Sequence, residues 1–154
     1  MNDEAPSAPR IVVGIDGSEP SKAALRWAVG QAELTSGVVD AVTAWDFPTS
    51  WYGLAPPTDK KPEDYEAQAR TFLNQTIDQS LGPGPGRPVP IYARAAYGHP
   101  AAVLLDAAAG ARMLVVGNRG HGGFTEALLG SVSQHCVQHA PCPVVVIRSH
   151  NHET

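Results

Sequence analysis

The sequence predicts an α/β fold in which a doubly wound sheet of five parallel strands carries helices on both faces. Short apolar runs rich in Val and Ile alternate along the chain with longer segments whose apolar residues recur at helical spacing. Clusters of Gly and Pro separate the two kinds of segment. This alternation favours parallel pairing through right-handed crossovers, and we expect the strand order 3-2-1-4-5.

Two strands and two helices are predicted in the first half of the chain. The strands are the apolar runs Arg10–Ile15 and Val38–Trp45. Ser18 or a neighbour is expected to cap a helix that runs to about Thr35, and Gly37 is expected to end it. A second helix over 62–81 is expected to turn three apolar side chains inward, namely Phe72, Leu73 and Ile77.

The segment between the second strand and the second helix is expected to be a long surface loop. It carries three prolines and the adjacent aromatic residues Trp51 and Tyr52. Long loops of this kind often hold a functional site or a partner contact.

Three more strands are predicted in the second half, over Ile91–Ala96, Met113–Val116 and Val144–Arg148. Helices are expected over about 101–109 and 131–139. Residues 1–9 are interpreted as a disordered leader and 149–154 as a frayed tail, with a single domain over 10–148.

A glycine-rich stretch follows the predicted fourth strand. It contains four glycines in seven residues, Gly117, Gly120, Gly122 and Gly123. Glycine leaves the backbone N–H groups accessible, and such a turn can bind phosphate. Ser131 and Gln134 have the spacing of a capping box, which predicts a helix start at Ser131 with its first N–H groups pointing outward. Taken alone, the glycines are equally consistent with a flexible connection.

The pattern Gly117-x-x-Gly120, followed after nine residues by Gly130-Ser131, resembles the nucleotide-binding signature of ATP-binding universal stress proteins. The resemblance continues through the last helix into Pro141–Ile147. It implies an adenine nucleotide alpha hydrolase-like fold that binds ATP, with Mg²⁺ on the nucleotide. It also implies a regulatory role in a stress response.

The resemblance assigns the site residues in two groups. The residue matching Asp16 lies near ribose and adenine in the family, and the backbone matching Gly14 and Ala44 frames the adenine. Asp16 is also a candidate to help hold Mg²⁺ or, alternatively, to cap the first helix. The expected phosphate site comprises Gly117, Asn118, Arg119, Gly120, His121, Gly122, Gly123, Gly130, Ser131 and Val132.

Two side chains in the phosphate site have alternative interpretations. Arg119 is the only cation inside the glycine-rich loop, so it is a candidate to neutralise phosphate charge or a solvated surface residue. His121 is interpreted as a loop residue rather than a catalyst.

Motifs typical of phosphoryl-transfer and hydrolytic enzymes are absent from the sequence. There is no Gly-x4-Gly-Lys-Ser/Thr motif, no Gly-x-Ser-x-Gly motif and no dinucleotide fingerprint after the first strand. We therefore expect binding with slow or no hydrolysis rather than an enzyme. The alternatives are a nucleotide hydrolase or adenylyl-transfer enzyme of the related α/β group, and a family member that works through protein contacts without nucleotide.

The His and Cys residues near the C-terminus are interpreted as packing or solvated groups. His135 and His139 lie one helical turn apart, a spacing that can bind zinc, but no Glu follows His135 as in zinc proteases. Cys136 lies on the apolar face of the predicted helix, and Cys142 lies between two prolines. No protein-only metal site is therefore expected.

Charge and hydropathy limit the expected partners. The net charge of −4 argues against general nucleic-acid binding, and no apolar run approaches the length of a membrane span. A cytoplasmic location is expected. The apolar strand Val144–Arg148 is predicted to lie at a sheet edge, where pairing with its own copy would give a homodimer.

Overall fold

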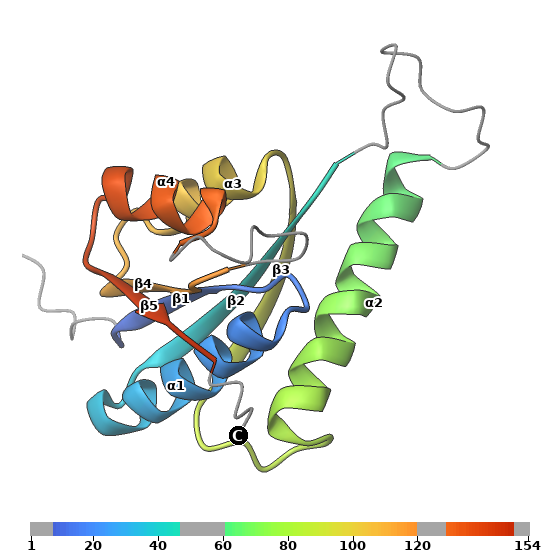
Figure 1. Ribbon diagram of the computed structural model, residues 1–154. Helices are drawn as coiled ribbons and strands as arrows, with labels where there is room; N and C mark the ends of the chain where they lie inside the picture. Colours follow the sequence, from blue (N-terminus) through green and yellow to red (C-terminus); the bar gives the residue numbers. More distant parts are fainter. Residues whose placement is uncertain (1–7, 47–60, 120–128, 150–154) are drawn as a thin grey trace, which may run out of the picture.

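The computed structural model describes residues 8–46, 61–119 and 129–149 (Figure 1). Its sheet has five parallel strands in the order β3-β2-β1-β4-β5, which confirms the predicted topology. The strands are β1 (Arg10–Gly14), β2 (Val38–Trp45), β3 (Ile91–Tyr97), β4 (Met113–Gly117) and β5 (Val144–Ile147). The helices are α1 (Glu19–Thr35), α2 (Pro62–Leu81), α3 (Pro100–Ala107) and α4 (Ser131–His139).

Helices cover both faces of the sheet, with α1 and α2 on one side and α3 and α4 on the other (Figure 1). Successive side chains of β1 therefore enter two different cores. Ile11 and Val13 pack in the cluster that includes Leu25 of α1. Val12 packs in the cluster that includes Leu104 of α3. Burial on both faces explains why this strand is a continuous apolar run.

The register places the ends of β1 and β4 side by side. Val13 of β1 is paired with Ala41 of β2 on one side and with Val115 of β4 on the other. The chain order reverses between these neighbours, so the crevice beyond their carboxyl ends is the switch point where doubly wound folds bind ligands. Within the described ranges, no helix is both long and apolar enough to cross a membrane.

Gly37 has a different role from the one predicted. The left-handed residue that ends α1 is Ser36, with φ 55°. Gly37 is required by close approach instead, because a Cβ at this position would lie 2.5 Å from the carbonyl oxygen of Pro9. That carbonyl also accepts the N–H of Val38 at 2.8 Å, which ties Pro9 to the start of β2.

The prediction that Phe72 turns inward is wrong. Leu73 and Ile77 are buried as expected, whereas Phe72 is 39% exposed. The buried stripe of α2 contains Leu73, Thr76 and Ile77, and Phe72 lies at the margin of that stripe.

Arg10 ties the start of β1 to its neighbours at the amino end of the sheet. Its Nη1 donates to Oδ2 of Asp40 at 3.0 Å and to the carbonyl of Ala107 at 2.9 Å. Its Nη2 donates to the carbonyl of Ala109 at 2.8 Å. The guanidinium thus donates hydrogen bonds to carbonyls at the C-terminal end of α3, where the negative end of the helix dipole favours a cation.

We predict that Arg10→Ala lowers the free energy of unfolding by about 2 kcal/mol, because three charge-assisted hydrogen bonds are lost at a partly buried site. Urea denaturation followed by circular dichroism measures the change. The control is Lys22→Ala, which breaks a 3.3 Å ion pair with a Glu19 side chain that is 70% exposed. That change should cost less than about 0.5 kcal/mol. Equal losses in the two variants would contradict the structural role of Arg10.

Candidate functional site

The turn between β1 and α1 is organised by Ser18. Ser18 is the N-cap of α1, and its Oγ accepts the N–H of Ser21 at 3.3 Å. Asp16 does not cap the helix itself. Its Oδ1 accepts the backbone N–H of Ser18 at 2.9 Å and the Ser18 hydroxyl at 2.5 Å. These bonds use one carboxylate oxygen, and because Asp16 is exposed its carboxylate is accessible to a ligand.

Gly117, at the end of β4, packs directly against the first turn of α1. A Cβ there would lie 2.6 Å from Cβ of Pro20 and 2.9 Å from the backbone nitrogen of Ser21. The carbonyl of Gly117 accepts the Ser133 hydroxyl at 2.5 Å. The glycine is therefore required by packing, and it joins the starts of α1 and α4 to the end of β4.

Two amides predicted to bind phosphate are engaged within the protein. The N–H of Asn118 donates to the carbonyl of Ile147 at 2.8 Å, and the N–H of Gly130 donates to the carbonyl of Asn118 at 2.7 Å. Phosphate donation by these two amides is incompatible with this arrangement. The side chain of Asn118 differs, because its buried Oδ1 has no hydrogen-bond partner among the described residues.

The helix α4 starts at Ser131, as predicted, but the predicted capping box does not form. Gly130 is the N-cap, with φ −71° and ψ 169°, and no side chain caps the helix. Ser131 is exposed at the first helical position, and Val132 is half-buried. The N–H groups of the first turn lack acceptors within the helix, so they form a positive end that favours an anion. Gly120, His121, Gly122 and Gly123 lie outside the described residues.

The contact between Ser18 and Arg119 connects the two halves of the switch point. The Ser18 hydroxyl lies 3.5 Å from the carbonyl oxygen of Arg119. Ser18 therefore lies between Asp16, which follows β1, and Arg119 in the predicted phosphate loop. The arrangement places a carboxylate, a guanidinium-bearing residue and a helix N-terminus at the same edge of the sheet.

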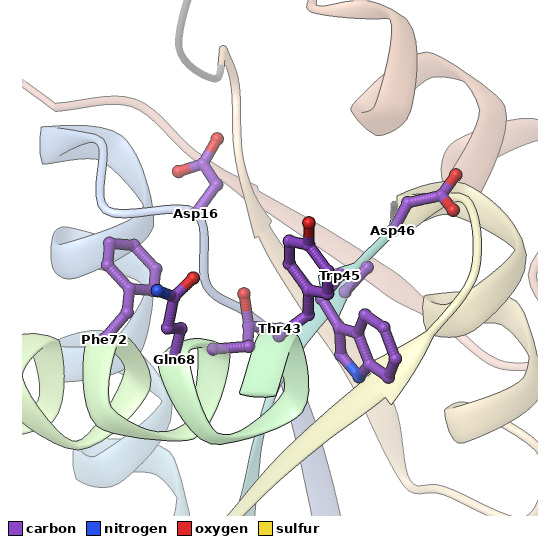
Figure 2. Close-up of a pocket in the computed structure, with 9 residues that line it drawn as sticks. Asp16, Thr43, Trp45, Asp46, Gln68 and Phe72 are labelled. Carbon is purple, nitrogen blue, oxygen red and sulfur yellow. The ribbon is translucent and has the colours of Figure 1, made fainter. Parts of the chain in front are cut away.

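A pocket of about 390 Å³ opens beside Asp16 (Figure 2). It brings together Asp16 and Ala44, which the family resemblance assigns to the ribose and adenine region. Gly14 is not among the lining residues, and a Cβ at this position would point toward α3, 2.8 Å from Cδ1 of Leu104. The lining residues are Asp16, Thr43, Ala44, Trp45, Asp46, Tyr65, Gln68, Ala69 and Phe72.

The α2 wall of this pocket was missed by the sequence reasoning. It consists of Tyr65, Gln68, Ala69 and Phe72, which share one helix face by their spacing of three and four residues. That spacing was visible, but amphipathic periodicity does not distinguish a core face from a ligand-facing one. Trp45, on the opposite wall, packs edge-to-face on Tyr97 with ring centroids 5.0 Å apart.

The C-terminal cysteines and histidines lie away from this pocket's lining. Cys136 is fully buried, as predicted, and burial raises the pKa of its thiol from 9.0 to about 11. Burial also raises the pKa of Cys142, against a smaller lowering by Arg10. His135 and His139 are exposed, with ring centroids 4.6 Å apart. In the described part of the chain, no three His, Cys, Asp or Glu residues are grouped to hold a metal.

Comparison with known proteins identifies the family. The universal stress protein family matches the chain over residues 8–148. The chain belongs to this family.

Relatives of this universal stress protein include two mycobacterial proteins. A universal stress protein of Mycolicibacterium smegmatis is 34% identical over 138 residues, which cover 90% of this chain and 45% of the relative. One of Mycobacterium tuberculosis is 33% identical over 147 residues, covering 94% of this chain and 50% of the relative. The chain thus spans about half the length of the curated relatives it matches.

Solved structures share the fold. UspA from Lactobacillus plantarum gives a TM-score of 0.63 at 22% identity, covering 94% of this chain and all of that one. An Arabidopsis thaliana family member with AMP bound gives a TM-score of 0.59 at 20% identity. The match covers 95% of this chain and 94% of that one. An Archaeoglobus fulgidus member in complex with dAMP gives a TM-score of 0.58 at 20% identity. The match covers 91% of this chain and 97% of that one.

We predict that Gly117→Ala destabilises this universal stress protein by about 1–3 kcal/mol, because the added methyl overlaps the backbone of α1. The control is Gly30→Ala within α1, where an added Cβ meets nothing within 4 Å. That change should stabilise by about 0.5–1 kcal/mol through higher helix propensity. Thermal or urea unfolding measures both, and an unaffected Gly117→Ala variant would refute the packing role.

The Cys136 thiol should make the wild-type protein lose stability at alkaline pH. Because burial raises the pKa in the folded state from 9.0 to about 11, the folded state holds its proton longer than the unfolded state. The free energy of unfolding should therefore fall as pH rises from 9 to 11, by roughly 2–3 kcal/mol. Urea denaturation of wild type and Cys136→Ala across this range measures the difference. Parallel pH profiles of the two proteins would contradict the prediction.

Proposed function

We propose that this universal stress protein binds ATP at the carboxyl edge of its sheet and acts as a regulatory module of the cytoplasmic stress response. The observation that carries the proposal is the position of Asp16 between a pocket and the residues that follow β4. On one side it lines the pocket that contains Ala44. On the other, it accepts the hydroxyl of Ser18, which lies 3.5 Å from the carbonyl oxygen of Arg119, a residue of the glycine-rich loop.

The charges of the site have the polarity that a nucleotide requires. Asp16 and Asp46 line the pocket, and carboxylates accept hydrogen bonds from ribose hydroxyls. Arg119 and the first turn of α4 lie beyond the end of β4, and a guanidinium and helix amides favour phosphate there. A volume of about 390 Å³ is within the usual range for small-molecule sites.

Structural relatives support an adenine nucleotide as the ligand class. Family members with the same fold have been solved with AMP, with dAMP and with cAMP. ATP is the finer proposal, and it rests on the glycine pattern that begins at Gly117. For Mg²⁺, the accessible carboxylate of Asp16 is a suitable hard ligand, and the ion would neutralise phosphate charge.

Slow or absent hydrolysis is part of the proposal. The described phosphate side presents Arg119 and helix amides but no lysine: Lys22 is paired with Glu19, and Lys61 precedes α2. Such a site holds the ground state and the transition state nearly alike, which favours binding over turnover.

A homodimer through β5 is also proposed. The four residues of β5 are half-buried and apolar, and in the described sheet the strand pairs with β4 alone. An apolar edge strand of this kind is usually covered, and a second copy would cover it symmetrically. The curated relatives are about twice as long as the match, so assembly in those larger proteins is a separate question.

ATP binding is tested by calorimetric titration of the purified protein with Mg-ATP, after mass spectrometry has identified any nucleotide released on denaturation. Asp16→Asn keeps an oxygen acceptor for Ser18 but removes the charge. Affinity should fall about tenfold, the equivalent of about 1.4 kcal/mol.

The matched control is Glu33→Gln, at an exposed position of α1 outside the pocket, which should bind as wild type. A wild-type protein that binds no adenine nucleotide would refute the proposal. Phosphate release well above background, lost in Asp16→Asn, would favour the hydrolase alternative.

A further inference from the structure

Two neighbouring faces of α2 have different partners. In the C-terminal half, Leu73, Thr76 and Ile77 are buried in the core. The pocket is lined by Tyr65, Gln68, Ala69 and Phe72, which recur at spacings of three and four and so share one face of the helix. Because Phe72 lies at the margin of the buried face, it lines the pocket instead of packing in the core.

The apolar side chain of Phe72 is partly exposed inside the pocket. The residue is 39% exposed and lines the pocket. Its ring lies on the same side of the pocket as the Gln68 side chain, with Asp16 across from them (Figure 2). An aromatic ring in such a position gains contact area when a flat ligand ring packs against it.

Gln68 supplies a complementary polar group one helical turn from Phe72. Its exposed amide presents one acceptor oxygen and two donor hydrogens side by side. Adenine presents a donor at N6 next to an acceptor at N7, so it matches an amide through two hydrogen bonds, whereas guanine presents two acceptors at O6 and N7. The amide therefore discriminates between the two purines.

We propose that Phe72 and Gln68 form the base-recognition wall of the nucleotide site, in which Phe72 packs on the base and Gln68 selects adenine. The inference rests on the proposed nucleotide function and deepens it. The two ends of the ligand are then fixed. The base lies against α2, the ribose lies by Asp16, and the phosphates extend past Ser18 toward Arg119.

The test is calorimetric titration with AMP, GMP and ribose 5-phosphate of wild type, Phe72→Ala and Gln68→Ala. Phe72→Ala should weaken AMP and GMP about tenfold each and leave ribose 5-phosphate within about twofold. Gln68→Ala should weaken AMP about tenfold and leave GMP within about twofold, which removes most of the preference for adenine.

The controls are two exposed residues outside the pocket. Leu34→Ala removes an apolar side chain that is 79% exposed, and Gln75→Ala removes an amide from α2. Both should bind AMP as wild type. Thermal unfolding shows that each variant is folded, and NMR of the AMP complex should show contacts between adenine protons and the Phe72 ring.

The outcomes separate this inference from the function on which it rests. If the wild type binds no nucleotide, both fail. If the wild type binds AMP while Phe72→Ala and Gln68→Ala bind it equally well, the base wall alone is refuted. Equal loss of AMP and GMP in Gln68→Ala would overturn the selective role of the amide.

Discussion

The missing side chain at position 117 is the constraint on which the candidate site depends. The end of β4 lies so close to the first turn of α1 that a Cβ would lie within 2.6–2.9 Å of Pro20 and Ser21. This approach allows Ser133 of α4 to donate to the Gly117 carbonyl while Ser18 reaches the carbonyl of Arg119. Three elements that are distant in the sequence therefore begin or end at one place.

Buried polar groups hold that junction together. Ser18, Ser21, Asn118 and Ser133 are each less than 10% exposed. Three of them are serines whose hydroxyls are hydrogen-bonded, which offsets the cost of burying them. The exception is the Asn118 side chain, whose Oδ1 lacks a partner in the described part of the chain. The hydrogen bonds from Ser18 in this network orient the Asp16 carboxylate at the edge of the pocket.

Most of the fold, but less of the site, could be predicted from the sequence. Apolar runs bounded by Gly and Pro are local signals, so the strands, the helix starting at Ser131 and the sheet order were accessible. The hydrogen bonds of the Asn118 and Gly130 amides could not be predicted, because their acceptors depend on how distant segments pack. Likewise, Gly14 and Gly117 read as ligand-facing glycines, whereas their lack of a side chain accommodates Leu104 and Pro20.

Phe72 illustrates a further limit of sequence reasoning. Its apolar character and spacing fit the core stripe of α2, yet it lines the pocket. Periodicity reports which face of a helix avoids water, but the sheet decides which part of that face meets the core and which part is left for a ligand. Gln68 was assigned no role for the same reason, since a polar residue on a helix face is normally read as solvated.

The two sides of the pocket are anchored unequally, which would give the proposed nucleotide binding a structural consequence. The Asp16 side is fixed by the junction around Gly117, whereas the first buried residue of α2 is Leu73, eleven positions after the helix begins at Pro62. No residue of α2 before Leu73 is buried, so we expect the N-terminal half of the helix to open more easily than the C-terminal half. A nucleotide that contacts both Asp16 and Phe72 would bridge the two sides and stabilise that half through its own binding free energy. The surface around the start of α2 would then differ between free and bound protein, which is the property that a regulatory module requires.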